Sequence, residues 1–125
     1  MAKALKRRRF SPSLFVLHFG LKSPQPQLKH HTICFGPRYR GLIDEIYGKP
    51  GLADDFSLYL HSPCATDPAM APEGSSTHYA LSPVPNLGTA PIDWAVEGPK
   101  YRDKILGYLE ARYIPNLRRD LVTTR

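Results

Sequence analysis

One short segment limits the possible folds more than any other part of the sequence. Residues 13–20, Ser-Leu-Phe-Val-Leu-His-Phe-Gly, place large apolar side chains on both alternating faces and follow directly after Pro12. A run this short, bounded by a proline and a glycine, predicts a β-strand that is buried on both sides. A sheet that contains such a strand needs a covering layer on each of its faces.

Three further segments show the alternation that is typical of strands. They are residues 28–35, 56–61 and 77–84. The alternation places Phe56, Leu58 and Leu60 on one face of their strand. It places Tyr79 and Leu81 on one face of the last strand. Loops rich in proline and glycine separate these segments, so we predict four short strands joined by loops.

A first helix is expected between the second and third strands. Pro37 suits the first position of a helix, where its missing N–H is not needed, and Gly48 suits the C-terminal end. Between them, apolar residues recur with the spacing of one helical face. They are Tyr39, Leu42, Ile43, Ile46 and Tyr47. We expect this stripe, Ile43 included, to be buried.

A second helix is expected to begin at Pro99 and to stop before Pro115, after a loop over residues 85–98 that contains Trp94. Its apolar stripe consists of Tyr101, Ile105, Tyr108 and Leu109. Strands joined by loops, with helices on one side, predict an α+β fold. We expect a small, mostly antiparallel sheet of about four strands, backed by two or three helices in a single domain.

The positive charge of the chain is concentrated at its start. The chain has 17 Lys and Arg against 11 Asp and Glu, and five of the basic residues lie within the first nine positions. They are Lys3, Lys6, Arg7, Arg8 and Arg9. Clustered cations attract phosphate groups, so these residues are candidates for contact with an anionic membrane surface, with nucleic acid as an alternative. The simpler interpretation is the solvated end of a helix.

The sequence offers no site for a nucleotide cofactor. Its nine glycines form neither a G-x-G-x-x-G nor a Walker pattern, which bring backbone N–H groups close to a pyrophosphate. We therefore expect neither FAD nor NAD to bind to this chain alone. No pattern identifies a catalytic group, and no catalytic residue is predicted.

Two histidines and a cysteine lie close together in the second predicted strand. His30, His31 and Cys34 are residue types that suit zinc. On a regular strand, His30 and His31 point to opposite faces, so at most one of them can share a site with Cys34. We therefore interpret all three as ordinary strand residues and predict no metal site.

Five strings of the sequence, in order and with matching spacing, resemble bacterial-type phytoene desaturases, the FAD-dependent carotenoid desaturase family. They are SLFVLHFGL (13–21), HHTICFGPRYRGLIDEIY (30–47), LADDFSLYLHSPCATDPAMAPEG (52–74), LSPVPNLGTAPIDW (81–94) and residues 97–125. The likeness covers roughly residues 5–125. It implies that the chain is an internal fragment of a flavoprotein several times longer.

Enzymes of that family bind FAD through a Rossmann fold near the N-terminus and a second glycine-rich motif near the C-terminus, both outside the strings matched here. The resemblance therefore implies a partial domain over residues 1–125, an incomplete substrate domain of a flavoprotein. Within it, residues 1–10 are a basic tail or helix remnant, and residues 11–125 belong to the substrate-binding region. FAD is expected in the full-length enzyme.

The resemblance also implies a substrate and a location. The family's enzymes remove hydrogen from a long isoprenoid hydrocarbon, phytoene or a related carotene, which dissolves in lipid. A cytoplasmic enzyme peripheral to a membrane surface is expected, with no nucleic acid partner. A hydrocarbon offers no hydrogen-bonding group, so its site must be apolar. The candidates for lining it are Phe56, Leu58, Leu60, Tyr79 and Leu81.

Two alternatives remain open from the sequence. The first is another carotenoid or retinoid redox enzyme of the same superfamily. The second is a free-standing basic module that binds an anionic membrane or nucleic acid. That module would need a closed core of its own, whereas a substrate-domain segment would leave one face of its sheet uncovered.

Overall fold

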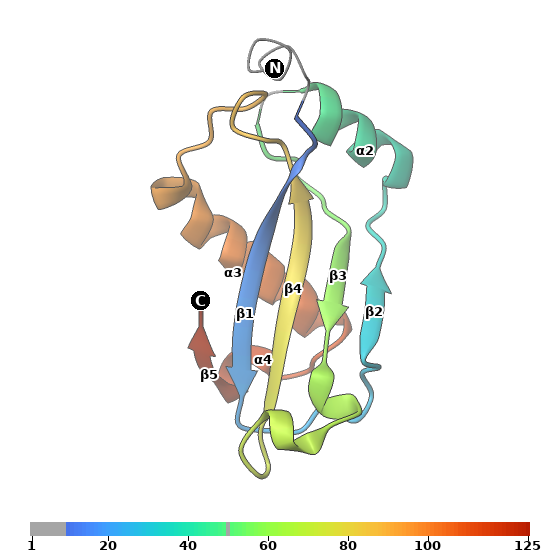
Figure 1. The fold of residues 1–125 in the computed structure, drawn as a ribbon, viewed down its shortest axis with the longest axis vertical. Coiled ribbons are helices and arrows are strands. Elements are labelled where there is room, and N and C mark those ends of the chain that lie inside the picture. Colours follow the sequence, from blue (N-terminus) through green and yellow to red (C-terminus); the bar gives the residue numbers. More distant parts are fainter. Residues whose placement is uncertain (1–9, 50) are drawn as a thin grey trace, which may run out of the picture.

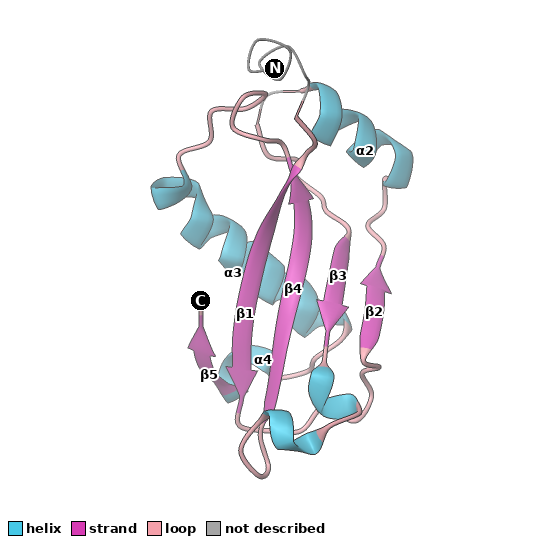
Figure 2. Ribbon diagram, in the orientation of Figure 1, coloured by secondary structure: helices cyan, strands magenta, loops and turns pink. Residues whose placement is uncertain are grey.

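The computed structural model describes residues 10–49 and 51–125, in which five strands form one sheet (Figure 1, Figure 2). They are β1 (Ser13–Leu21), β2 (His31–Cys34), β3 (Leu58–His61), β4 (Ser76–Val84) and β5 (Leu121–Thr124). Their order is β2-β3-β4-β1-β5, and every neighbouring pair is antiparallel. The predicted α+β class is confirmed, with five strands where about four were expected.

The two central strands, β1 and β4, pair along nine residues, from Ser13 opposite Val84 to Leu21 opposite Ser76. β2 is shorter than its predicted range because the chain bends at His30 before the strand begins and leaves the ladder after Cys34. The Gly36 N–H donates to the Ser57 hydroxyl oxygen at 3.0 Å. A side chain at Gly36 would collide with the backbone carbonyl of Phe56, so only glycine allows this close approach.

Three α-helices accompany the sheet: α2 (Tyr39–Gly48), α3 (Trp94–Arg112) and α4 (Leu117–Asp120). Two short 3₁₀ helices, Pro63–Ala65 and Pro68–Met70, lie between β3 and β4. Figure 1 shows α3 crossing behind the strands, whereas α2 sits at one end of the sheet. The helices therefore cover one face only, and no element of the described residues lies over the other face.

The hydrophobic core fills the space between the sheet and α3. Leu17 and Phe19 of β1 and Ile105 and Leu109 of α3 are each at most 2 % exposed. Alternation along the strands sends every second side chain into this layer. The Ser82 and Tyr101 hydroxyls, 2.6 Å apart and buried, satisfy each other where α3 meets β4. The core is therefore one-sided, and the sheet's second face takes no part in it.

The predicted start of α3 at Pro99 is wrong, because the helix begins at Trp94. The Asp93 carboxylate accepts a hydrogen bond from the Ala95 N–H at 3.0 Å, which is the contact of an N-terminal cap. Trp94 stacks on Phe15 of β1 with ring centroids 5.4 Å apart. This contact holds the first turn against the sheet, so Pro99 is accommodated inside the helix. The helix ends before Pro115, as predicted.

The stripe predicted for α2 is only half correct. Leu42 and Ile46 are buried against the end of the sheet, at 4 % and 6 % exposure. Ile43 and Tyr47, expected beside them, are 41 % and 66 % exposed. The helix touches the sheet's end rather than its face, so there is room to bury a narrow line of side chains and not a full stripe.

Candidate functional site

The uncovered face of the sheet carries two rows of side chains that cross four strands. The strand register places Ile33, Tyr59, Leu81 and Val16 in the first row, from β2 to β1. The same register places His31, His61, Tyr79 and His18 in the second. Register partners have Cβ atoms about 4.5–5.5 Å apart. The face therefore has an apolar band beside a band of histidine and tyrosine rings.

The apolar band continues toward α2. Leu14 and Pro83 are register partners one step beyond the first row. Together with Leu42 and Ile46 of α2 they line an apolar pocket of about 280 Å³. Val16 is 40 % and Leu14 54 % exposed, so these side chains are available to a further layer. We call this surface, from the first row to the pocket beside α2, the apolar track.

The five predicted substrate-lining residues do not form one wall. Phe56, Leu58 and Leu60 point into the core beneath the helix layer and are at most 6 % exposed. Tyr79 and Leu81 lie on the opposite, uncovered face, within the two rows. The sequence pattern defined each face correctly, but only the packing of α3 decides which face is closed. We retain Tyr79 and Leu81 as lining candidates and correct the other three to core residues.

The exposed apolar track should determine how the isolated chain behaves in solution. The chain should bind a hydrophobic dye and self-associate as its concentration rises, because exposed apolar patches of this kind drive association. Val16→Lys should remove most of the dye fluorescence and reduce light scattering. Val96→Lys on α3, at a valine that is 52 % exposed, is the matched control and should change neither. Equal effects of both variants would contradict a binding surface confined to the track.

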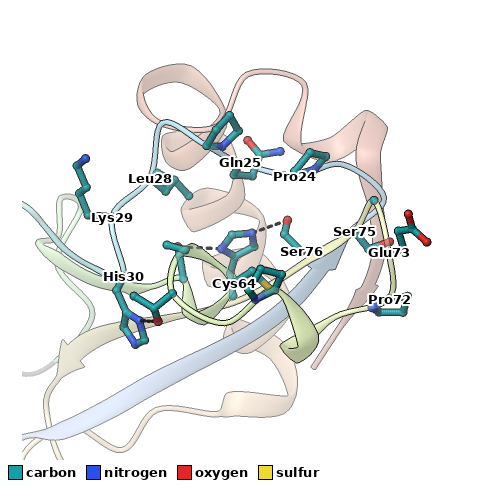
Figure 3. A pocket seen from close by; sticks show the side chains of 17 residues that line it. Pro24, Gln25, Leu28, Lys29, His30, Cys64, Pro72, Glu73, Ser75 and Ser76 are labelled. Carbon is teal, nitrogen blue, oxygen red and sulfur yellow. Dashed lines mark hydrogen bonds between the residues drawn. The ribbon is translucent and has the colours of Figure 1, made fainter.

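A second hollow, of about 720 Å³, lies at the other end of the sheet (Figure 3). His30, Cys64 and Ser76 are among the residues that line it. The His78 ring is hydrogen-bonded through Nδ1 to the Ser62 hydroxyl and through Nε2 to the Ser76 hydroxyl, both at 2.9 Å. Burial, followed by the charge of neighbouring His61, lowers the pKa of His78 to about 4. The ring is therefore neutral at pH 7 and acts as a structural link.

The interpretation of His30, His31 and Cys34 as strand residues is correct for His31 and Cys34 and wrong for His30. β2 begins at His31, and His30 lies in the bend before it, so the alternation rule does not apply to the pair. Both imidazoles reach His61: the ring centroids of His30 and His31 lie 4.7 and 5.5 Å from that of His61. Cys34 points into the core, where burial raises the pKa of its thiol. No pattern in the sequence indicated this cluster.

The basic residues Lys3, Lys6, Arg7, Arg8 and Arg9 lie outside the described residues, and their predicted contact with a membrane surface stays a prediction. Within residues 10–49 and 51–125, no helix combines the length and the apolar composition needed to cross a bilayer.

The fold defines a class of protein segment: an α+β layer whose sheet has one face that the described residues leave uncovered. No protein-family model matches the sequence. Curated relatives do, along almost its whole length. The lycopene-forming phytoene desaturases of Pseudescherichia vulneris and of a Paracoccus strain are 66 % and 65 % identical over 124 residues, or 99 % of the chain.

A neurosporene-forming phytoene desaturase from Cereibacter sphaeroides is 50 % identical over 110 residues, or 85 % of the chain. The chain spans about a quarter of the length of these relatives, 25 % of the first two and 21 % of the third. It corresponds to a segment of the bacterial phytoene desaturase family, as the resemblance of its sequence strings indicated.

Proposed function

We propose that this chain is part of an FAD-dependent oxidoreductase that desaturates phytoene in carotenoid biosynthesis, and that its apolar track forms one wall of the substrate site. The names of the relatives support the reaction. The observation that supports this position for the substrate site is the row on the uncovered face, which consists of Ile33, Tyr59, Leu81 and Val16. A hydrocarbon must be held by shape and apolar contact, and this row leads into the pocket beside α2.

The described residues do not fit the flavin itself. The positive-φ glycines are Gly51 and Gly74, and neither precedes a helix that points its N–H groups at an open site. The longest helix, α3, begins with the Asp93 carboxylate on its N-terminus and Glu97 in its first turn, which would repel a pyrophosphate. FAD would therefore bind to other parts of the enzyme, and no step through the flavin is derived from this segment.

The substrate's solubility in lipid supports a cytoplasmic enzyme at a membrane surface, and the basic cluster at Lys3–Arg9 would contact anionic lipid there.

A free-standing basic module is the weaker proposal. It needs a closed core, whereas this sheet leaves Leu14, Val16 and Ile33 between 40 % and 56 % exposed on one face. Relatives that match 99 % of the chain also carry the desaturase name.

A chimera tests the proposal. This segment replaces the matching quarter of the Pseudescherichia vulneris enzyme, and products formed from phytoene are measured by chromatography. Leu81→Asp should reduce desaturation at least about tenfold, because it leaves an unpaired charge against a hydrocarbon. Leu81→Met should remain active. Leu87→Asp changes a leucine that is 61 % exposed in the loop after β4, and should have little effect.

The flavin content of the Leu81→Asp variant distinguishes two roles of the apolar track, contact with substrate and contact with another domain of the enzyme. If Leu81→Asp keeps its FAD and loses activity, the apolar track contacts substrate. If the variant loses FAD or becomes insoluble, the track packs against another domain, and the proposed wall is refuted. Full activity of Leu81→Asp refutes it as well.

A further inference from the structure

We propose that His30, His31 and His61 bind a zinc ion at the edge of the uncovered sheet face, a site that is independent of the proposed desaturase function. Each residue offers one ring nitrogen, and these three atoms lie within 4.8 Å of one another. Zinc binds imidazole nitrogen at about 2.0–2.1 Å, so the three rings must turn toward one another for one ion to bind all of them.

The backbone holds the three histidines in place. His31 of β2 and His61 of β3 are register partners in an antiparallel ladder. The ladder continues one step further, because the Ser62 N–H donates to the His30 carbonyl at 2.9 Å. The backbone of each strand therefore holds the histidines on or next to it in position. The pairing of β2 with β3 holds the two strands in position relative to each other. A site preformed in this way does not have to be ordered by the metal.

The hydrogen bond at His30 Nδ1 leaves the other ring nitrogen, Nε2, free to bind a metal. The Thr66 hydroxyl donates to the Pro63 carbonyl at 3.3 Å, so its oxygen accepts from His30 Nδ1–H at 2.5 Å. This tautomer leaves a lone pair on His30 Nε2, which lies 2.8 Å from His61 Nε2. Metal-bound histidines usually donate their other N–H to an oxygen in this manner.

His31 has a matching outer partner. Its Nδ1 lies 2.5 Å from the Tyr59 hydroxyl, on the same face of the sheet. When the imidazole donates this hydrogen bond, its Nε2 is free to bind metal. Two of the three ligands thus have an oxygen partner on Nδ1, which leaves Nε2 for a metal.

The His61 ring carries the proton that holds the metal-free cluster together. Because His30 Nε2 is an acceptor, the metal-free contact requires the proton on His61 Nε2. Its buried Nδ1 then has no hydrogen-bond partner among the described residues. When zinc takes the place of this shared proton, the proton moves to His61 Nδ1 and three zinc–nitrogen bonds form.

Three protein ligands leave the fourth position of a tetrahedral zinc ion open. His30 also lines the hollow of about 720 Å³ shown in Figure 3, where its side chain is drawn at one end of the cavity. The open position would take a water molecule or a small anion. Imidazole ligands suit zinc, as they also suit copper, iron and nickel, whereas calcium and magnesium prefer oxygen ligands.

The test uses the 125-residue chain without a polyhistidine tag, titrated with ZnSO₄ by calorimetry and with CoCl₂ by absorption spectroscopy. We expect one ion per chain and the visible absorption of tetrahedral cobalt. His31→Gln changes an exposed ligand and should weaken binding at least tenfold while the circular dichroism spectrum stays unchanged. Thr66→Val removes the outer partner of His30 and should weaken binding about 10- to 100-fold.

His18→Gln is the matched control, because His18 is an exposed histidine on the same face and lies two strands away from His61. It should bind zinc like the unchanged chain. Absence of stoichiometric zinc binding refutes the site. So does a loss in His18→Gln equal to that in His31→Gln, which would show non-specific binding by surface histidines.

Discussion

Replacing Ile105 by alanine should lower the free energy of unfolding by about 2–5 kcal/mol, the range for truncating a large side chain in a packed core. Ile105 is fully buried, in the middle of α3, against the inner face of the sheet. Alanine is a good helix former, so the helix itself is not weakened. The loss in free energy of unfolding therefore measures the cost of the cavity. Urea denaturation followed by Trp94 fluorescence measures it, because Trp94 packs on Phe15 in the same core.

Ile43→Ala is the matched control for this prediction. It removes the same atoms from another helix, α2, at a side chain that is 41 % exposed. The expected loss is below about 1 kcal/mol, because little apolar surface returns to water and no closed cavity forms. Equal losses in the two variants would mean that the core is not centred between α3 and the sheet.

Acidification should destabilise the chain well before its carboxyl groups are protonated. The folded state lowers the pKa of His78 to about 4, chiefly by burial, whereas an unfolded histidine titrates near 6.5. Above pH 6.5 the ring is neutral in both states and costs nothing. As the pH falls from 6.5 toward 4, the unfolded state takes up a proton that the folded state excludes. The free energy of unfolding therefore falls by about 3 kcal/mol over this window.

Urea denaturation at a series of pH values checks this result. His78→Gln has no proton to bind in the unfolded state, so the slope between pH 6.5 and 5 should flatten. His18→Gln, which removes an exposed histidine from the same sheet, should leave the slope in place. A slope that persists in His78→Gln would assign the acid sensitivity to another group.

The sequence determined those features that arise from contacts close along the chain. The alternation in residues 13–20 and 77–84 identified β1 and β4, because a strand of nine residues repeats its pattern often enough to be recognised. Pro115 marked the end of α3 for an equally local reason, since proline cannot continue a helix. The strings that resemble phytoene desaturases identified the family, a conclusion that depends on no tertiary contact.

Other features could not be predicted because they depend on contacts between distant residues. β5 has only four residues, and it becomes a strand because the edge of β1 accepts it, with Phe19 opposite Thr124. The start of α3 was misjudged because Asp93 and Pro99 are both acceptable helix beginnings. The stacking of Trp94 on Phe15, 79 residues away in sequence, favours the earlier one.

The candidate site shows the same division. Strand alternation separated Leu58 and Leu60 from their neighbours on the other face, but both faces of this sheet carry apolar side chains, and sequence cannot tell which face a helix will cover. Packing of α3 settles that question and leaves Leu81 on the open side. The bend at His30 and the pairing of β2 with β3 bring together three histidines that alternation would have separated. Local pattern sets which side chains share a strand face, and only the tertiary structure decides what each face meets.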